Sequence, residues 1–223
     1  MSESSITHAP ADSGVPLQAR DFSVKELVVI ITGAGQGIGR ELARQYAAAG
    51  AFPVIADLNL DTAASVVQEI EAAGGQALAV QVDVGDKASV DAMVAQVLKV
   101  HGRIDVLINN ASIFAALEKC AFDQIPYQQW QKVLHVNITG TYLCVCAVAQ
   151  AMRDAKFGRI INISSDAVPR GTMNYLHYVT SKSALIGMSN SLARELGPHG
   201  ITVNCVRPGT VETEVEERMA NLT

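Results

Sequence analysis

Two residues of this sequence, Tyr178 and Lys182, have the types and the spacing of an acid–base pair. They are four positions apart in a segment that predicts a helix, so their side chains share one helix face. A free tyrosine has a pKa of about 10 and is a poor base at neutral pH, but a nearby ammonium group stabilises the phenolate. We expect Tyr178 to exchange a proton with an alcohol or a carbonyl oxygen. Taken alone, this spacing is also that of a common structural pair on a helix.

A glycine-rich turn follows the first predicted strand and directly precedes a helix. It is the segment Thr32-Gly-Ala-Gly-Gln-Gly-Ile-Gly39. Glycines allow a tight turn and a close approach of the backbone to a pyrophosphate, and the helix N-terminus adds free N–H groups and the positive end of its dipole. The spacing differs from the GxGxxG fingerprint, and no Gly-Lys-Ser/Thr follows as in a Walker loop. The strand–turn–helix context favours a dinucleotide site over the alternative of an ordinary loop.

Asp57 is the candidate for choosing between dinucleotides. It ends the second predicted strand, twenty residues after Gly37, where an acidic side chain would bind the ribose hydroxyl groups of adenosine. Its charge would repel a 2′-phosphate, and Gln36 stands where an arginine would indicate NADP. The sequence therefore favours NAD over NADP, with capping of the next loop as the alternative role for Asp57.

Short β-branched segments alternate with longer amphipathic segments from Leu27 onward, which is typical of βαβ units. Several predicted strands are apolar at successive positions, as expected when helices cover both faces of a parallel sheet. The sequence predicts one doubly wound, Rossmann-type α/β domain at residues 25–223, after a flexible leader at residues 1–24. The predicted strands are 27–32, 53–57, 77–84, 104–110, 158–164 and 201–206, and the predicted helices are 37–49, 61–73, 87–101, 127–153 and 174–196.

Composition and charge exclude several classes of protein. With 49% hydrophobic and 17% charged residues, the 223-residue chain can bury a sizeable core. The net charge of −5 argues against a nucleic-acid partner. The N-terminus has no secretory pattern, and the longest apolar stretch is far shorter than the ~20 residues of a membrane span. The four cysteines and five histidines lack metal-ligand spacing, so we expect no metal site and a reduced, cytoplasmic setting.

Four motifs together resemble those of the short-chain dehydrogenase/reductase family. They are the glycine-rich turn, Asn109-Asn-Ala-Ser112, Tyr178-Val-Thr-Ser-Lys182 and Pro208-Gly209, which occur in the family's order. The segments GRIINISS and YVTSKSALIGM are most similar to the branch of 3-oxoacyl-carrier-protein reductases and secondary-alcohol dehydrogenases. The resemblance implies a Rossmann fold and the NAD(P)-dependent oxidation of alcohols or reduction of carbonyls.

The resemblance also implies roles for individual residues. Tyr178 would be the acid/base, Lys182 would tune it, Ser165 would bind the reacting oxygen, and Asn137 would complete a proton relay. Ser164 is the alternative to Ser165, and a buried polar residue that holds an irregular helix is a compatible role for Asn137. The implied cofactor contacts are Gly33, Gln36, Gly37, Ile38, Gly39, Asp57, Asp83, Val84, Asn110, Ala111, Tyr178, Lys182, Pro208, Gly209, Val211 and Thr213.

The chain departs from the family's pattern at two places. Ser112 stands where the family has a glycine, which we expect to tighten a turn. The chain stops at Thr223, before the substrate-covering helical segment and the last strand that the family adds. Either the sequence is incomplete, or this is a truncated form whose sixth predicted strand we expect to be an exposed edge. We expect an active dehydrogenase, with a non-catalytic NAD-binding regulator or an inactive truncated subunit as alternatives.

Two long apolar segments, 127–153 and 174–196, are similar to the helices through which family members form dimers and tetramers. We expect a homotetramer or homodimer, the alternative being that these helices only cover the sheet. The expected partner is a small-molecule alcohol or carbonyl compound. We expect the substrate pocket to be lined by the stretches 112–117 and 166–175 and by the region after Pro208, and Val168, Met173 and Leu176 predict that it is largely apolar.

Overall fold

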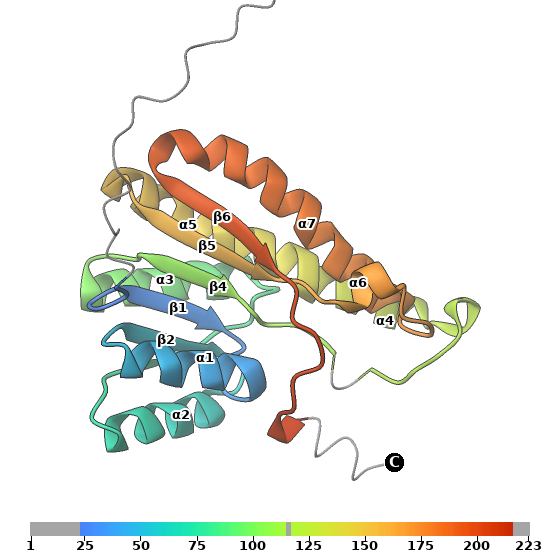
Figure 1. Cartoon of the computed structure of the whole chain (residues 1–223), viewed down its shortest axis with the longest axis horizontal. Helices are drawn as coiled ribbons and strands as arrows, with labels where there is room; N and C mark the ends of the chain where they lie inside the picture. The colour runs from blue at the N-terminus through green and yellow to red at the C-terminus, as the bar shows by residue number, and fades with distance from the viewer. Residues whose placement is uncertain (1–22, 115–116, 216–223) are drawn as a thin grey trace, which may run out of the picture.

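A computed structural model describes residues 23–114 and 117–215 and contains one six-stranded parallel sheet (Figure 1). The strand order is β3-β2-β1-β4-β5-β6, so β1 and β4 are neighbours from which the sheet grows in opposite directions. This is the Rossmann order predicted from the sequence, and ligands bind at the switch between its halves. The strands are β1 (Val28–Thr32), β2 (Phe52–Asp57), β3 (Leu78–Gln81), β4 (Val106–Asn109), β5 (Gly158–Ile163) and β6 (Ile201–Val206).

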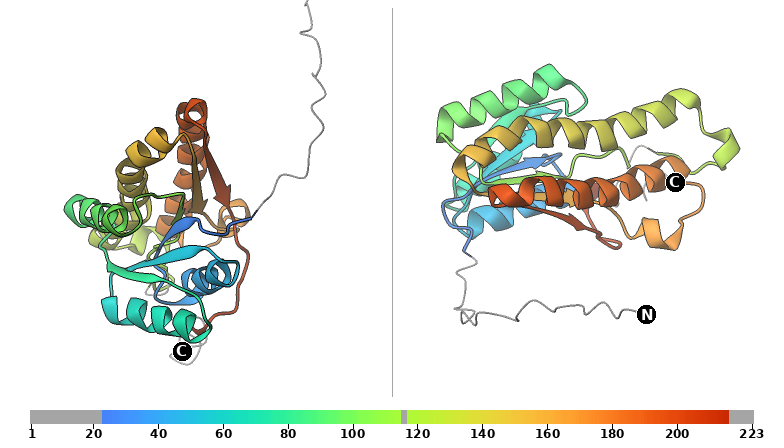
Figure 2. Two further views of the ribbon diagram at one scale, coloured as in Figure 1. Left: turned by 90° about the vertical axis from the view of Figure 1, so that its left-hand side faces the viewer. Right: turned by 90° about the horizontal axis from the view of Figure 1, so that it is seen from above.

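Helices cover both faces of the sheet (Figure 2). Helices α1 (Gly37–Ala48) and α2 (Leu60–Ala72) pack on one face, and α3 (Lys87–His101), α5 (Thr141–Ala155) and α7 (Leu176–Leu196) pack on the other. The shorter elements are η1 (Phe122–Gln124), α4 (Tyr127–Leu134), η2 (His135–Gly140), α6 (Ala167–Arg170) and η3 (Gly197–His199).

The alternation of side chains along β1 divides the core into two layers. Ile30 packs with Val94 of α3 and Val148 of α5, whereas the next residue, Ile31, packs with the residues of α1 and α2. All five residues of β1 are buried. Because successive strand residues point to opposite faces, a strand covered on both faces must be apolar at every position, which is the pattern in the sequence.

Particular residues define the ends of helices α2 and α7. Asn59, and not Asp61, caps α2, because its side-chain oxygen accepts hydrogen bonds from the backbone of Asp61 and Thr62. Gly197 does not end α7 in a left-handed turn, since its φ is −53° and the chain continues into η3. Gly200, with φ +74°, is the left-handed residue that ends this run.

The predicted helix 127–153 is a continuous helical run of three parts, α4, the π-helical segment η2 and α5. The run Tyr127–Ala155 contains a window whose mean hydropathy, 1.3, and length would suit a membrane span, and 44% of that window is buried. Its apolar residues Cys144, Val148 and Met152 are fully buried against the sheet. Packing into the core explains the apolar character of this helix.

The sheet ends at β6 within the part of the chain that the structure describes. Ile201 and Val203 are buried while Thr202 and Asn204 are exposed, so one face of β6 is covered and the other is open. Most of the predicted leader, residues 1–22, lies outside the described residues, as do residues 216–223.

Candidate active site

The glycine-rich turn joins β1 to α1 at the carboxyl edge of the sheet. Gly33 has φ +64°, and a Cβ atom there would lie 2.8 Å from Cα of Ala111. A Cβ atom at Gly39 would collide with the carbonyl oxygen of Gly33 and lie 2.6 Å from Nδ2 of Asn110. The turn therefore requires glycine at both positions, for conformation at the first and for space at the second.

The segment after β4 holds this turn in place. Asn110 donates from Nδ2 to the carbonyl oxygens of Thr32 and Gly33, each at 3.0 Å. The Thr32 hydroxyl oxygen accepts from the backbone N–H groups of Asn110 and Ala111 at 3.1 and 3.0 Å. Asn110 thus ties the two halves of the sheet together at the switch point. Thr32 begins the glycine-rich motif but was not among the predicted site residues.

Asp57 lies at the end of β2 with both carboxylate oxygens engaged. One oxygen accepts from the backbone N–H of Gly35 at 2.8 Å, and the other accepts from Asn59 at 3.0 Å. Asp57 therefore caps the following loop, which is the alternative role predicted for it. The same carboxylate lines the cavity beside the turn, where ribose hydroxyl groups could reach it.

A cavity of about 970 Å³ runs along the carboxyl edge of the sheet, at the upper end of the range for small-molecule sites. All the predicted site residues except Gly39 and Asn137 line it. The cradle of glycines, the first turn of α1 and the Asp57 carboxylate are donors and acceptors of the kinds that a dinucleotide needs. The residues present therefore fit this cofactor.

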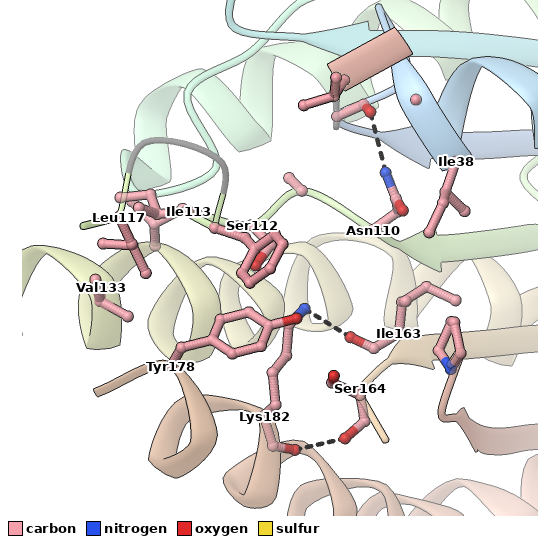
Figure 3. A pocket seen from close by; sticks show the side chains of 18 of the residues that line it. Ile38, Asn110, Ser112, Ile113, Leu117, Val133, Ile163, Ser164, Tyr178 and Lys182 are labelled. Carbon is pink, nitrogen blue, oxygen red and sulfur yellow. Dashed lines mark hydrogen bonds between the residues drawn. The ribbon is translucent and has the colours of Figure 1, made fainter. Parts of the chain in front are cut away.

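Tyr178 projects from α7 into this cavity, one helical turn before Lys182 (Figure 3). Burial is the larger influence and raises the pKa of Tyr178, while a hydrogen bond with Ser165 lowers it. The expected net lowering of this pKa is therefore wrong for the structure described here. At neutral pH the Tyr178 side chain is a protonated phenol, which can donate a proton.

Lys182 is buried with its ammonium nitrogen held by the backbone. Its Nζ donates to the carbonyl oxygen of Ile163, the last residue of β5, at 2.8 Å and lies 5.8 Å from the centre of the Tyr178 ring (Figure 3). Burial lowers the pKa of Lys182 to about 8. The group can therefore gain and lose a proton near neutral pH.

The two serines after β5 have different partners. The Ser164 hydroxyl donates to the backbone carbonyl oxygen of Lys182 at 2.8 Å and is buried (Figure 3). The Ser165 hydroxyl lowers the pKa of Tyr178, accepts from the backbone N–H of Ala167 at 3.1 Å and lines the cavity. The geometry thus favours Ser165 over Ser164 for contact with a reacting oxygen.

Asn137 lies inside the π-helical segment η2, so the expected helix irregularity is confirmed. Its side chain accepts from the backbone N–H of Ile113 at 2.8 Å and donates to the Ser181 hydroxyl at 2.9 Å. The Ser181 hydroxyl in turn donates to the carbonyl oxygen of Tyr178 at 2.8 Å. Asn137 therefore links the loop after β4 to the turn of α7 that carries Tyr178.

Aromatic and aliphatic side chains line the end of the cavity beside Tyr178. The Phe114 ring lies 4.7 Å from the Tyr178 ring and 5.8 Å from the Tyr175 ring, measured between centroids. Leu117 and Val133 are buried in the same cluster. Residues of all three expected stretches, 112–117, 166–175 and the region after Pro208, line the cavity. Three residues expected there do not line the cavity, namely Val168, Met173 and Leu176, of which the last two are exposed on the surface.

Ser112 occupies the position of the family's glycine without backbone strain. The described non-glycine residues with positive φ are Glu26, Lys156 and Asn174, so Ser112 has no left-handed conformation. Its buried hydroxyl has no hydrogen-bond partner among the described residues, and Ser112 lines the cavity. The Ser112 hydroxyl can therefore bond to a ligand in the cavity. The expected tightening of the turn does not strain the backbone at this position.

A six-stranded parallel sheet in Rossmann order, with a glycine turn, a serine and a Tyr-xxx-Lys pair at its carboxyl edge, defines a nucleotide-dependent oxidoreductase. Residues 27–221 match the family described as short chain dehydrogenase, and the chain belongs to this family of NAD(P)-dependent enzymes. Within residues 23–114 and 117–215, no group of three His, Cys, Asp or Glu side chains could hold a metal ion.

Known relatives agree with this assignment. The chain is 38% identical over 198 residues to the (2S)-[(R)-hydroxy(phenyl)methyl]succinyl-CoA dehydrogenase subunit BbsD of Thauera aromatica, covering 89% of this chain and 78% of the relative. It is 39% identical over 193 residues to a 3-oxoacyl-[acyl-carrier-protein] reductase of Synechocystis, covering 86% and 77%. A 3-ketoacyl-(acyl-carrier-protein) reductase from Brucella melitensis, solved in complex with NADH, superposes with a TM-score of 0.82 at 31% identity, covering 86% of this chain and 79% of that chain.

Proposed function

We propose that this enzyme interconverts a secondary alcohol and a ketone, with NAD as its cofactor and Tyr178 as its acid/base. One observation carries the proposal: Tyr178, Ser165 and the buried Lys182 line the same cavity as the glycine-rich turn. Bound NAD would accept a hydride from the alcohol, and NADH would return it to the ketone.

Tyr178 and Ser165 act on the reacting oxygen. In reduction the Tyr178 phenol donates its proton to the carbonyl oxygen, and in oxidation the phenolate takes the alcohol proton. The raised pKa of Tyr178 keeps the phenol protonated at neutral pH, which suits the reductive direction. Ser165 donates a hydrogen bond to the same oxygen and orients it toward the phenol.

Lys182 and Asn137 support this proton transfer indirectly. Lys182, with a pKa lowered to about 8, can resupply the proton that Tyr178 donates. It would also hold ribose hydroxyl groups of the cofactor, since it lines the cavity. Asn137 positions α7 through Ser181, and its role in the relay is to maintain the path between Lys182 and solvent.

The preference for NAD rests on the Asp57 carboxylate. Its negative charge at the end of β2 would repel a 2′-phosphate, and its oxygens could accept hydrogen bonds from ribose hydroxyl groups. Gln36, also in the cavity lining, supplies no positive charge to offset this repulsion. Both features favour NAD.

The cluster of Phe114, Leu117, Val133 and Tyr175 favours a substrate with an apolar or aromatic group beside the reacting carbon. We further propose that residues 25–223 form a single domain and that the enzyme works in the cytoplasm as a homotetramer or homodimer. The likeness of the segments 127–153 and 174–196 to the helices that join subunits in the family supports this assembly.

The test is turnover by the purified chain on a panel of ketones and secondary alcohols, with NADH or NADPH and with NAD or NADP. The proposal predicts turnover that requires the nicotinamide cofactor and is faster with NAD than with NADP at equal concentrations. Tight NAD binding with no turnover on any substrate would instead favour a non-catalytic regulator or an inactive subunit. The mass of the purified chain, measured in the same experiment, shows whether the protein tested has this 223-residue sequence.

A further inference from the structure

Helix α1 begins at the glycine-rich turn without a cap from its own sequence. Its N-cap residue, Gln36, makes no capping hydrogen bond through its side chain, and none of the described residues in its first turn is acidic. By contrast, the side chains of Asn59 and Asp86 cap α2 and α3. A helix N-terminus without a local cap attracts an anion from elsewhere.

In this structure the anion comes from the chain itself. The backbone N–H of Gly37 donates to Oε1 of Glu214 at 2.8 Å, and the guanidinium of Arg40 lies 3.5 Å from the same oxygen. The segment with Glu214 follows β6 and runs past the end of the sheet to α1 (Figure 1). The hydrogen bond from Gly37 is the largest cause that lowers the pKa of Glu214, so this side chain is a carboxylate at neutral pH.

We propose that the Glu214 carboxylate occupies the pyrophosphate subsite of the dinucleotide site and must leave it before the dinucleotide binds. The inference rests on the proposed function, which places a pyrophosphate at the first turn of α1. A carboxylate oxygen and a phosphate oxygen use the same N–H donor of Gly37, and two anions in one place repel each other.

The residues on either side of Glu214 belong to the cavity wall, so movement of Glu214 out of the subsite also affects that wall. Thr213 and Val215, on either side, both line the cavity. A Cβ atom on Gly37 would lie 3.3 Å from Cγ2 of Val215, so this segment lies closely over the turn. When Glu214 is in place, the segment closes the subsite, and dinucleotide affinity is reduced by the fraction of molecules in that closed state.

Replacing Glu214 by glutamine tests the inference, with Glu212→Gln as the matched control. Glu212 is exposed, and its substitution removes the same charge from the same segment. Dissociation constants for NAD, for ADP and for adenosine, which lacks phosphate, are measured by calorimetry or by competition. We expect Glu214→Gln to bind NAD and ADP roughly three- to tenfold more tightly than the unmodified chain, with adenosine unchanged. The Glu212→Gln protein should match the unmodified chain for all three ligands.

Thermal unfolding adds a readout that does not depend on turnover. Without ligand, Glu214→Gln should unfold at a lower temperature than the unmodified chain, because the N-terminus of α1 loses the negative charge that the helix dipole favours. With saturating NAD its stabilisation should be larger, because no contact has to be broken.

The outcomes separate this inference from the function on which it rests. Equal or weaker NAD binding by Glu214→Gln would overturn the inference and leave the proposed function standing, because the site would still bind the dinucleotide. A gain in adenosine affinity as large as the gain for ADP would also overturn it, since the effect would not depend on phosphate. If all three folded proteins failed to bind NAD, the proposed function would fall and the inference with it.

Discussion

Lys182 donates its ammonium hydrogen bond to the backbone carbonyl oxygen of Ile163, at 2.8 Å, so the last residue of β5 fixes the position of a side chain on α7. The lysine is 3% exposed, which makes its charge costly to the fold. A second hydrogen bond joins the end of β5 to α7, because the Ser164 hydroxyl donates to the carbonyl oxygen of Lys182. Lys182 thus belongs to a strand–helix junction held largely by backbone oxygens.

Lys182→Met should stabilise the protein near neutral pH while abolishing most of its activity. A pKa lowered to about 8 from the model-peptide value of 10.5 means that charging Lys182 opposes folding below pH 8. This opposition amounts to about 3 kcal/mol at pH 7, of which the lost hydrogen bond to Ile163 offsets about 1 kcal/mol. We therefore expect Lys182→Met to gain about 1 to 2 kcal/mol in urea unfolding at pH 7.

The pH dependence of this gain has a definite sign. Above pH 8 the folded protein holds a neutral amine, whereas the unfolded chain still binds the proton up to its pKa of about 10.5, so the unmodified protein recovers stability as pH rises. The advantage of Lys182→Met over the unmodified chain should shrink by about 2 kcal/mol between pH 7 and pH 10. A difference in unfolding free energy that stays constant over this range would contradict the buried-charge account.

Ser165→Ala should mainly reduce activity, whereas Ser164→Ala should mainly reduce stability. Ser165→Ala removes the hydroxyl beside Tyr178, and we expect kcat to fall roughly 10- to 1,000-fold with NAD affinity unchanged. Ser164→Ala removes a buried hydrogen bond to Lys182 and should cost about 1 kcal/mol of stability, with a smaller effect on kcat. Steady-state kinetics and urea unfolding on both proteins check this, and the reverse ranking in kcat would assign the reacting oxygen to Ser164.

Asp57→Asn should relax the discrimination against NADP. The amide keeps an oxygen that can accept from Gly35 but removes the charge that repels a 2′-phosphate. We expect the ratio of the NADP and NAD dissociation constants to fall by about tenfold or more. Asp61→Asn, on the exposed first turn of α2, is the control and should leave the ratio unchanged. If both proteins showed the same ratio as the unmodified chain, Asp57 would have only its capping role.

Gly39→Ala and Gly187→Ala test the same substitution in two different surroundings. At Gly39 the new methyl group would collide with the carbonyl oxygen of Gly33, and we expect a loss of about 1 to 3 kcal/mol in stability together with weaker NAD binding. At Gly187, inside α7, no described atom lies within 4 Å of the added Cβ, and alanine should stabilise the helix by up to about 1 kcal/mol. Thermal unfolding of the two proteins gives the comparison, and equal behaviour would remove the case for a tightly packed turn.

The sheet and most of its helices could be predicted because their signals are local. β6 and α3 have the predicted bounds, and the other strands differ by a few residues at their ends. Strands such as β1, buried on both faces, leave an unbroken apolar pattern. The family, its fold and its class of reaction were all predicted from motifs within short segments and are confirmed.

The contacts that the sequence could not predict join side chains to backbone N–H groups that are far away in the sequence. The bond between Asn137 and the backbone of Ile113, and the one between Gly37 and Glu214, depend on loops that only tertiary packing brings together. Individual pocket residues were mispredicted for the same reason, although the predicted stretches do line the cavity. Met173 is near Tyr178 in the chain but faces outward, 83% exposed, while Val133 comes from a different helix and is buried beside the phenol.

Turnover and NAD binding by Tyr178→Phe, measured on the same preparation, test the central claim most directly. The substitution keeps the ring that packs against Phe114 and removes only the hydroxyl, so the fold and the cofactor cavity should be retained. We predict an NAD dissociation constant within about twofold of the unmodified chain and a fall in kcat of at least about 100-fold. Retained turnover, or an equal loss of turnover and NAD binding in a protein that is still folded, would contradict the assignment of Tyr178 as the acid/base.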